Sequence, residues 1–141
     1  MKTLRLLDAN VNRLKEGLRV VEDCTRYILD SKKLSLRLKL LRHKVVLDSK
    51  VLYARDSMND VLKQNIESEG TRLDLQSILK ANFKRAEESA RVLEEFLKIE
   101  ELKGLGRWED FKDIRYELYD LEREVLAELD HRHLAKHITE D

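Results

Sequence analysis

The chain of 141 residues carries 28 basic and 28 acidic side chains, so its formal net charge is zero. A chain of this length is expected to form one domain with a substantial core. The balanced charge argues against a positive field that would gather nucleic acid or an anionic membrane, and neither is expected as a partner. The single cysteine excludes an internal disulfide, nothing at the N-terminus resembles a signal peptide, and a cytoplasmic location is expected.

The composition predicts an all-α protein. There is no proline and there are four glycines, whereas leucine, glutamate, lysine and arginine are abundant. These residues favour helices, and no run of β-branched residues alternates with the period of two that a half-buried strand shows. We expect four long helices, arranged as two helical hairpins related by a pseudo-twofold axis in a bundle. They cover residues 4–29, 33–54, 73–99 (with a start between 73 and 77) and 108–133.

The first predicted helix carries a polar edge beside its apolar face. The apolar face consists of Leu7, Val11, Leu14, Leu18, Val21 and Ile28. Asn10, Arg13 and Gly17 lie three and four residues apart at the border of that face. Buried polar side chains need partners, so this edge forms either a network that fixes helix register or a polar cavity. In a cavity, the arginine would bind phosphate or carboxylate groups.

The second predicted helix, residues 33–54, ends at a turn-rich break over residues 55–60. The break contains Arg55, Asp56 and Asp60. Short polar side chains cap new helical turns, so these residues are either capping residues or the charged part of a phosphate-handling site. Residues 64–72 are polar and form the expected junction between the two halves of the chain.

The third predicted helix repeats the first. Residues 80–95 follow the pattern of residues 8–23, A-N-x-x-R-x-x-E-[GS]-x-R-V-x-E, at an offset of 72 residues. The pattern places Asn10 over Asn82, Arg13 over Arg85, Glu16 over Glu88, Arg19 over Arg91 and Glu22 over Glu94. Packing alone does not require these polar residues to recur. We therefore expect an internal duplication, with halves at about residues 4–66 and 73–138.

The glutamates of the two copies allow two interpretations. Glu16 and Glu22 flank Arg19 at a spacing of three, and the second copy repeats the arrangement. Such neighbours form surface ion pairs worth roughly 0.2–0.5 kcal/mol each. Carboxylates are also the ligands that Mg²⁺ prefers. The predicted metal ligands are therefore Glu16, Glu22, Glu88 and Glu94.

Five stretches of the chain, taken in order, resemble one known family. They are LLDANVNRLKEGLRVVEDCTRYIL, LRHKVVL, LYARDSMNDV, ILKANFKRAEESARVLEEFLK and IRYELYDLE, within residues 4–122. The family is the helical domain at the N-terminus of cyanobacterial and plastid-type thiamine phosphate synthases, which also occurs as a stand-alone protein. The chain, which has no room for the synthase barrel, resembles the stand-alone form. It departs from the family at Leu62, where a glycine is expected, and at Ser89, where another small residue replaces glycine.

The resemblance implies an ATP-dependent kinase that uses Mg²⁺. It would phosphorylate 4-amino-5-hydroxymethyl-2-methylpyrimidine phosphate to the diphosphate used in thiamine biosynthesis. The family is unrelated to the ribokinase-like enzyme that usually catalyses this step. Neither a G-x-x-x-x-G-K-[ST] loop nor a G-x-G-x-x-G pattern is present, so arginines and helix N-termini would hold the phosphates. The expected catalytic residues are Asp56, Asp60 and Arg55. The expected substrate- and nucleotide-binding residues are Asn10, Arg13, Arg19, Arg42, His43, Asn82, Arg85 and Arg91.

Two other classes of function stay open at this point. An all-α, Mg²⁺-dependent nucleotide pyrophosphohydrolase would also use clustered carboxylates on helices. A non-catalytic helical partner of thiamine phosphate synthase would bind that enzyme and turn over nothing. The expected small-molecule ligands are the pyrimidine phosphate and ATP, and a homodimer stays open because long helices often leave an apolar stripe for a twofold partner.

Overall fold

Four α-helices form the body of the protein. The computed structural model describes residues 2–133, apart from the side chains of residues 67 and 68. The helices are α1 (Lys2–Asp23), α2 (Lys32–His43), α3 (Leu75–Phe96) and α4 (Trp108–His131). The segments between them are η1 (Cys24–Ile28, a π-helix) and three 3-10 helices, η2 (Ser49–Ala54), η3 (Glu67–Gly70) and η4 (Glu100–Leu105). The described part of the chain contains no strand, which confirms the predicted all-α bundle.

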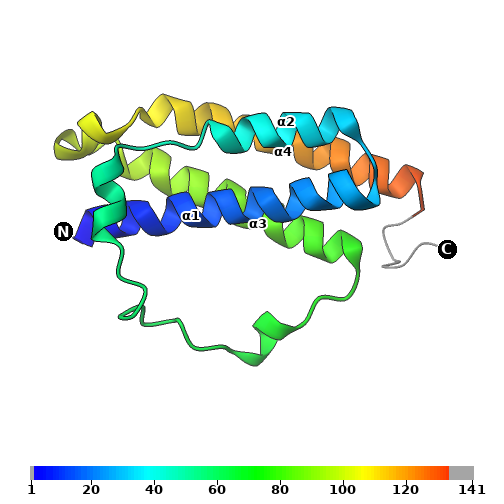
Figure 1. Ribbon diagram of the computed structural model, residues 1–141, viewed down its shortest axis with the longest axis horizontal. Helices are drawn as coiled ribbons and strands as arrows, with labels where there is room; N and C mark the ends of the chain where they lie inside the picture. The colour runs from blue at the N-terminus through cyan, green and yellow to red at the C-terminus, as the bar shows by residue number, and fades with distance from the viewer. Residues whose placement is uncertain (1, 134–141) are drawn as a thin grey trace.

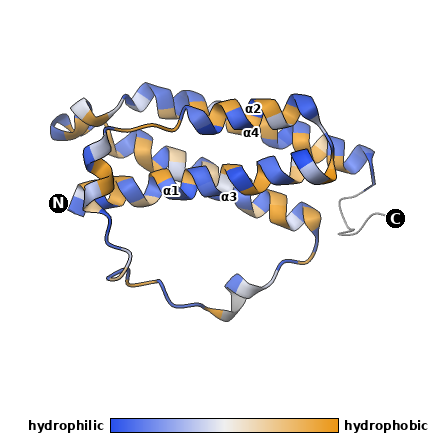
Figure 2. Cartoon of the chain, viewed as in Figure 1, coloured by the Kyte–Doolittle hydropathy of each residue, from blue (hydrophilic) through white to orange (hydrophobic). Residues whose placement is uncertain are grey.

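The bundle is built around the pair of helices α1 and α3. They lie side by side, with α2 packed on α1 and α4 packed on α3 (Figure 1). Hydrophobic and hydrophilic residues follow one another along every helix, as amphipathic packing requires (Figure 2). Of the predicted apolar face of α1, Leu7, Leu14, Leu18 and Val21 are buried and Val11 and Ile28 are partly buried. Each fully buried leucine stabilises the fold by about 1.5–3 kcal/mol relative to an exposed one.

Capping side chains accept backbone hydrogen bonds where two of the helices begin. The hydroxyl of Ser31 accepts a hydrogen bond from the backbone N–H of Leu34 at 3.3 Å at the start of α2. A carboxylate oxygen of Asp74 accepts one from the N–H of Ser77 at 2.8 Å at the start of α3. Such caps satisfy backbone donors that the first helical turn leaves free. They fix the starts of α2 and α3.

The prediction of the second helix is wrong for its C-terminal half. α2 ends at His43 rather than Ala54, residues 45–48 have no regular secondary structure, and η2 follows. A backbone hydrogen bond from the N–H of Asp48 to the carbonyl of Leu105, 2.9 Å long, fixes the end of this segment. Gly106 also makes room for this segment, since an added Cβ would lie 2.4 Å from the side chain of Leu47. Tertiary contacts at the end of the bundle therefore override the helical pattern.

The other helix ends lie close to the predicted ones. The last residues of the first predicted helix form the π-helix η1, and α3 and α4 end at Phe96 and His131. Residues 134–138 of the second predicted half lie outside the described residues. Among residues 2–133, no helix combines the length and the apolar composition that crossing a membrane requires.

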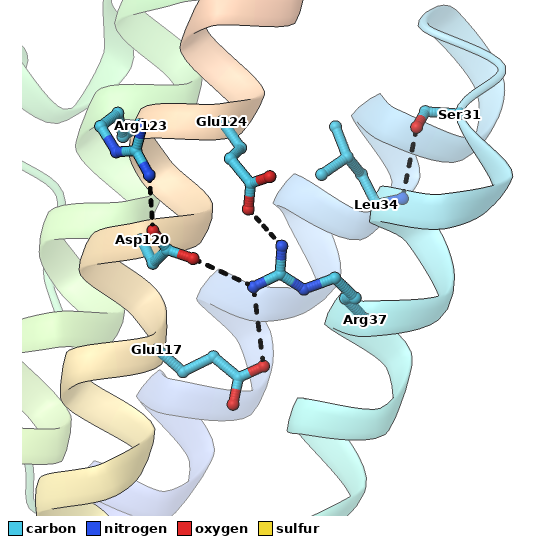
Figure 3. Close-up of polar contacts among 7 residues, drawn as sticks. All are labelled: Ser31, Leu34, Arg37, Glu117, Asp120, Arg123 and Glu124. Carbon is cyan, nitrogen blue, oxygen red and sulfur yellow. Dashed lines mark hydrogen bonds and ion pairs between the residues drawn. The ribbon is translucent and has the colours of Figure 1, made fainter.

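An ion-pair network joins the two outer helices. Arg37 of α2 reaches three carboxylates on α4, those of Glu117 at 3.9 Å, Asp120 at 3.3 Å and Glu124 (Figure 3). Asp120 is also bound by Arg123 at 2.8 Å. The hydrogen bond to Glu124 is the main reason why the pKa of Arg37 lies above its usual value. This network ties the first hairpin to the second across the face where α2 and α4 meet.

Candidate functional site

A cavity of about 630 Å³ lies between α1 and the segment that follows η2, and we call it the α1 cavity. From α1 it is lined chiefly by Arg5, Asp8, Asn10, Asn12, Arg13 and Glu16. From the segment after η2 it is lined by Arg55, Asp56, Ser57 and Asp60. The first copy of the repeated motif and the turn-rich break, which the sequence singled out separately, therefore form one site. Its volume falls within the range of about 300–1,000 Å³ common for small-molecule sites.

An ion pair holds the two walls of the α1 cavity together. Arg55 donates two hydrogen bonds to Asp8, from Nε to Oδ2 and from Nη2 to Oδ1, each 2.9 Å long. The side chain of Asp8 is 8% exposed, whereas that of Arg55 is 47% exposed. These hydrogen bonds, with the nearby charge of Glu16, raise the pKa of Arg55 further above its usual value. Arg55 is thus a fixed positive charge at the mouth of the cavity.

The two aspartates after Arg55 shape the loop and also face the cavity. Asp56 accepts hydrogen bonds from the backbone N–H of Asn59 at 3.3 Å and from its side-chain amide at 2.9 Å. These bonds, aided by the charge of Arg5, hold the pKa of Asp56 below its usual range. Asp60 accepts a hydrogen bond from the N–H of Leu62 at 2.9 Å. Capping and site formation are therefore compatible roles for these residues.

Leu62 takes an ordinary backbone conformation, although the family pattern led us to expect glycine there. Among the described residues other than glycine, only Asp30 and His133 have a positive φ angle. A leucine at position 62 therefore requires no strained backbone.

The two repeated asparagines make the same local hydrogen bond. The side-chain amide of Asn10 donates to the carbonyl of Leu6 at 2.9 Å, and that of Asn82 donates to the carbonyl of Ile78 at 2.8 Å. Only Asn10 lines the α1 cavity. The following residues of the second copy, Arg85 and Glu88, are exposed on α3 and do not belong to this cavity.

Two of the predicted metal ligands pair with arginines instead. Glu22 accepts hydrogen bonds from Nε of Arg42 at 2.9 Å and from its Nη2 at 3.4 Å. Glu94 accepts equivalent bonds from Arg115, at 3.1 Å and 3.4 Å. Both carboxylates are 3% exposed, and each pair joins the two helices of one hairpin. Arg42, which was predicted to bind substrate or nucleotide, thus lies in an ion pair between α1 and α2 and outside the α1 cavity.

The four predicted metal ligands do not come together. Glu16 lines the α1 cavity, Glu88 is exposed on α3, and the other two form the arginine pairs. Across residues 2–133, no three histidine, cysteine, aspartate or glutamate side chains are grouped so that they could hold a metal ion. A metal ion at the α1 cavity would therefore need ligands beyond the protein side chains.

Three further predicted binding residues lie outside the α1 cavity. Arg19 is exposed and lies 3.9 Å from Asp23. Arg91 is exposed and pairs with Glu95 at 3.1 Å. His43 is exposed at the end of α2. The spacing of three and four residues produced surface ion pairs at both arginines.

The sequence interpretation missed several residues of the cavity wall, among them Lys2, Arg5, Asp8, Asn12 and Ser57. Arg5, Asp8 and Asn12 line the cavity, and the amide of Asn12 donates to Oδ1 of Asp8 at 3.4 Å. Their spacing of three and four residues places them on one face of α1, together with Glu16. Extending the polar edge by one helical turn toward the N-terminus would have found Arg5 and Asp8, whereas Asn12 lies within the stretch already considered.

The fold and the cavity define an all-α protein with a cavity lined by arginines and carboxylates. Residues 5–124 match the model of the ThiD2 family, and the chain belongs to this family. The family indicated by the sequence resemblance is thus confirmed.

Curated relatives are thiamine-phosphate synthases. The protein of that name from Synechocystis sp. is 39% identical over 126 residues, which make up 87% of this chain and 36% of the relative. The one from Prochlorococcus marinus is 40% identical over 127 residues, 86% of this chain and 35% of the relative. The one from Rhodopirellula baltica is 36% identical over 129 residues, 86% and 34% of the two chains. This chain spans about a third of the length of these relatives, and no solved structure matches it.

Proposed function

We propose that this protein acts in thiamine biosynthesis as an ATP-dependent kinase of 4-amino-5-hydroxymethyl-2-methylpyrimidine phosphate. Its membership of the ThiD2 family and its thiamine-phosphate synthase relatives support the pathway. One structural observation supports the chemistry: Arg13 and Arg55, from separate elements, line one cavity with Asp56 and Asp60. Arginines bind phosphates by charge-assisted hydrogen bonds, and carboxylates serve the cation that accompanies ATP.

The proposed reaction joins two phosphates. An oxygen of the acceptor phosphate bonds to the γ-phosphorus of ATP, the bond from that phosphorus to the β–γ bridging oxygen breaks, and ADP leaves. Both reactants are anions, so catalysis requires that they be held in line and that their charge be neutralised. Arg5, Arg13 and Arg55 would supply fixed positive charge at the cavity, and Asn10 would orient a polar group of the ligand.

The carboxylates of the cavity fit a magnesium ion that enters with ATP. Mg²⁺ in phosphate sites is commonly held by one or two carboxylates, the phosphates and water, so a three-carboxylate cluster is not required. One or two of Asp56, Asp60 and Glu16 would hold it, together with the phosphate oxygens and water. The lowered pKa of Asp56 keeps this carboxylate ionised at neutral pH, as a metal ligand must be. When bound, the ion would supply neutralisation of the phosphate charge.

The direct test is turnover by the purified protein. It is incubated with ATP, Mg²⁺ and the pyrimidine monophosphate, and the products are identified by ³¹P NMR and mass spectrometry. The proposal expects the pyrimidine diphosphate and ADP in equal amounts. An Arg13→Ala/Arg55→Ala double variant, purified in the same way and checked for helicity, controls for contaminating kinases.

Two other outcomes of this experiment would favour a different function. Release of pyrophosphate from a nucleotide without the acceptor would favour a pyrophosphohydrolase. Absence of turnover together with stable binding to a thiamine-phosphate synthase would favour a non-catalytic partner.

A further inference from the structure

Asp8 is a buried carboxylate at the edge of the α1 cavity. It accepts two hydrogen bonds from Arg55, each 2.9 Å long, and a weaker one from Asn12 at 3.4 Å. With 8% of its side chain exposed, Asp8 offers little surface to a ligand. Both of its oxygens are already engaged by donors of the protein. Its contribution to the site therefore passes through Arg55.

The geometry of the ion pair leaves part of Arg55 available. A guanidinium carries five N–H donors, and Asp8 uses one on Nε and one on Nη2. The remaining donors, including both on Nη1, belong to a side chain that is 47% exposed and lines the cavity. Because a bidentate pair fixes the plane of the guanidinium, Asp8 also fixes the direction of these free donors.

Two other arginine–glutamate pairs with two hydrogen bonds differ from the pair of Asp8 and Arg55 in the exposure of the arginine. In the pairs of Glu22 with Arg42 and of Glu94 with Arg115, the arginine side chains are 19% and 12% exposed. Those arginines are enclosed between helices, whereas Arg55 is open to the cavity. The second motif copy has Lys80 where the first has Asp8, so it has no carboxylate at the equivalent position.

We propose that Asp8 is a positioning residue of the α1 cavity, which holds the guanidinium of Arg55 with its free donors directed at a bound phosphate. This inference rests on the proposed kinase function. It assigns the phosphate contact to Arg55 and a purely orienting role to Asp8 and, behind it, Asn12.

A double-mutant cycle tests the assignment. The variants are Asp8→Asn, Arg55→Ala and the two combined, with kcat/KM measured for the pyrimidine phosphate. Each single variant is expected to lower kcat/KM by about 100-fold, since misplacing a contact group by about 1 Å has effects of that size. The double variant is expected to match Arg55→Ala alone, because Asp8 acts only through Arg55.

Thermal stability provides the matching readout. Arg55→Ala leaves Asp8 buried without its main partner, so adding Asp8→Asn should raise the melting temperature while activity stays unchanged. Arg115→Lys is the control for breaking a bidentate pair elsewhere: it should lower the melting temperature and leave kcat/KM within about twofold. A further loss of activity when Asp8→Asn is added to Arg55→Ala would overturn the inference, as would full activity of Asp8→Asn.

An NMR measurement separates this inference from the proposed function. The signal of the Nε proton of Arg55 is assigned by its loss in Arg55→Lys. This proton should exchange slowly with water in the wild type and rapidly in Asp8→Asn. If the wild type shows no kinase activity, the cycle is repeated with the affinity for Mg²⁺ and ATP measured by calorimetry. Absence of both turnover and binding rejects the kinase and the inference drawn from it. An unchanged Arg55 signal in Asp8→Asn rejects the positioning role alone.

Discussion

Gly17 of α1 packs directly against the backbone oxygen of Asn82 of α3. An added Cβ at Gly17 would lie 2.9 Å from that oxygen and 3.4 Å from the Cβ of Ala86. Both Gly17 and Asn82 belong to the repeated motif, so its small residue serves the close approach of the two central helices. The space beside Gly17 is therefore occupied by α3 and is not open to a ligand.

Replacing Gly17 by alanine should therefore destabilise the protein. Alanine gains about 1 kcal/mol of helix propensity, but crowding against the backbone costs about 1–3 kcal/mol. The expected net loss is about 0–2 kcal/mol, measured by urea denaturation. Gly104→Ala is the control, because no other atom lies within 4 Å of its added Cβ. A Gly17→Ala variant more stable than the wild type by the full helix-propensity gain of about 1 kcal/mol would contradict the close packing.

The ion pair of Glu22 and Arg42 should behave as a buried structural pair. Arg42→Leu leaves a carboxylate that is 3% exposed without its partner, and a loss of about 3 kcal/mol is expected. Adding Glu22→Leu removes the unpaired charge and should restore most of the stability. Arg132→Gln breaks an exposed pair with Glu128 and should cost less than about 1 kcal/mol. A double variant less stable than Arg42→Leu would show that the pair stabilises the fold in its own right.

Glu87 should make stability fall with rising pH. Its side chain is buried on α3, and neither carboxylate oxygen has a hydrogen-bond partner among the described residues. Burial and the neighbouring Glu122 of α4 raise its pKa from 4.5 to about 8, against the opposing effect of Lys84 at 3.5 Å. The folded protein therefore keeps a proton that the unfolded chain releases. This contribution is complete below about pH 4.5 and is lost as pH rises to about 8.

The measurement is the free energy of unfolding of the wild type and of Glu87→Gln between pH 5 and 8. The wild type should lose on the order of a few kcal/mol, since each unit of pKa shift corresponds to about 1.4 kcal/mol. Glu87→Gln cannot ionise, so its stability should vary less over the same range. Parallel curves for the two proteins would assign the titration to other groups.

Arg13 and Arg85 occupy equivalent positions but should differ in function. Both side chains are exposed, but Arg13 lines the α1 cavity and Arg85 lies on α3 outside it. Losing one charge-assisted bond to phosphate costs about 1.5–3 kcal/mol, so Arg13→Gln should raise the KM for a phosphate substrate at least about tenfold. Arg85→Gln should change it by less than about twofold. Equal effects in steady-state kinetics would mean that both copies bind substrate.

Helical spacing predicted the helices and the polar edge of α1, because both depend on residues close in sequence. It did not show that α2 ends at His43, since that end depends on Leu105 and Gly106, which lie far along the chain. The α1 cavity exists only because the chain then returns to α1 and places Arg55 beside Asp8. The pairing of Glu22 with Arg42 could not be predicted for the same reason, because Arg42 lies on another helix, 20 residues away.

The first turn of α1 has an electrostatic consequence for any anion near the cavity. Lys2 and Arg5 line the cavity from this turn, which contains no acidic residue. The N-terminal end of a helix also carries about half a positive charge from its aligned peptide dipoles. The part of the cavity next to this turn is therefore positive, although Glu16, Asp56 and Asp60 contribute negative charge elsewhere in its wall. A phosphate group should bind at the positive part, and added salt should weaken that binding.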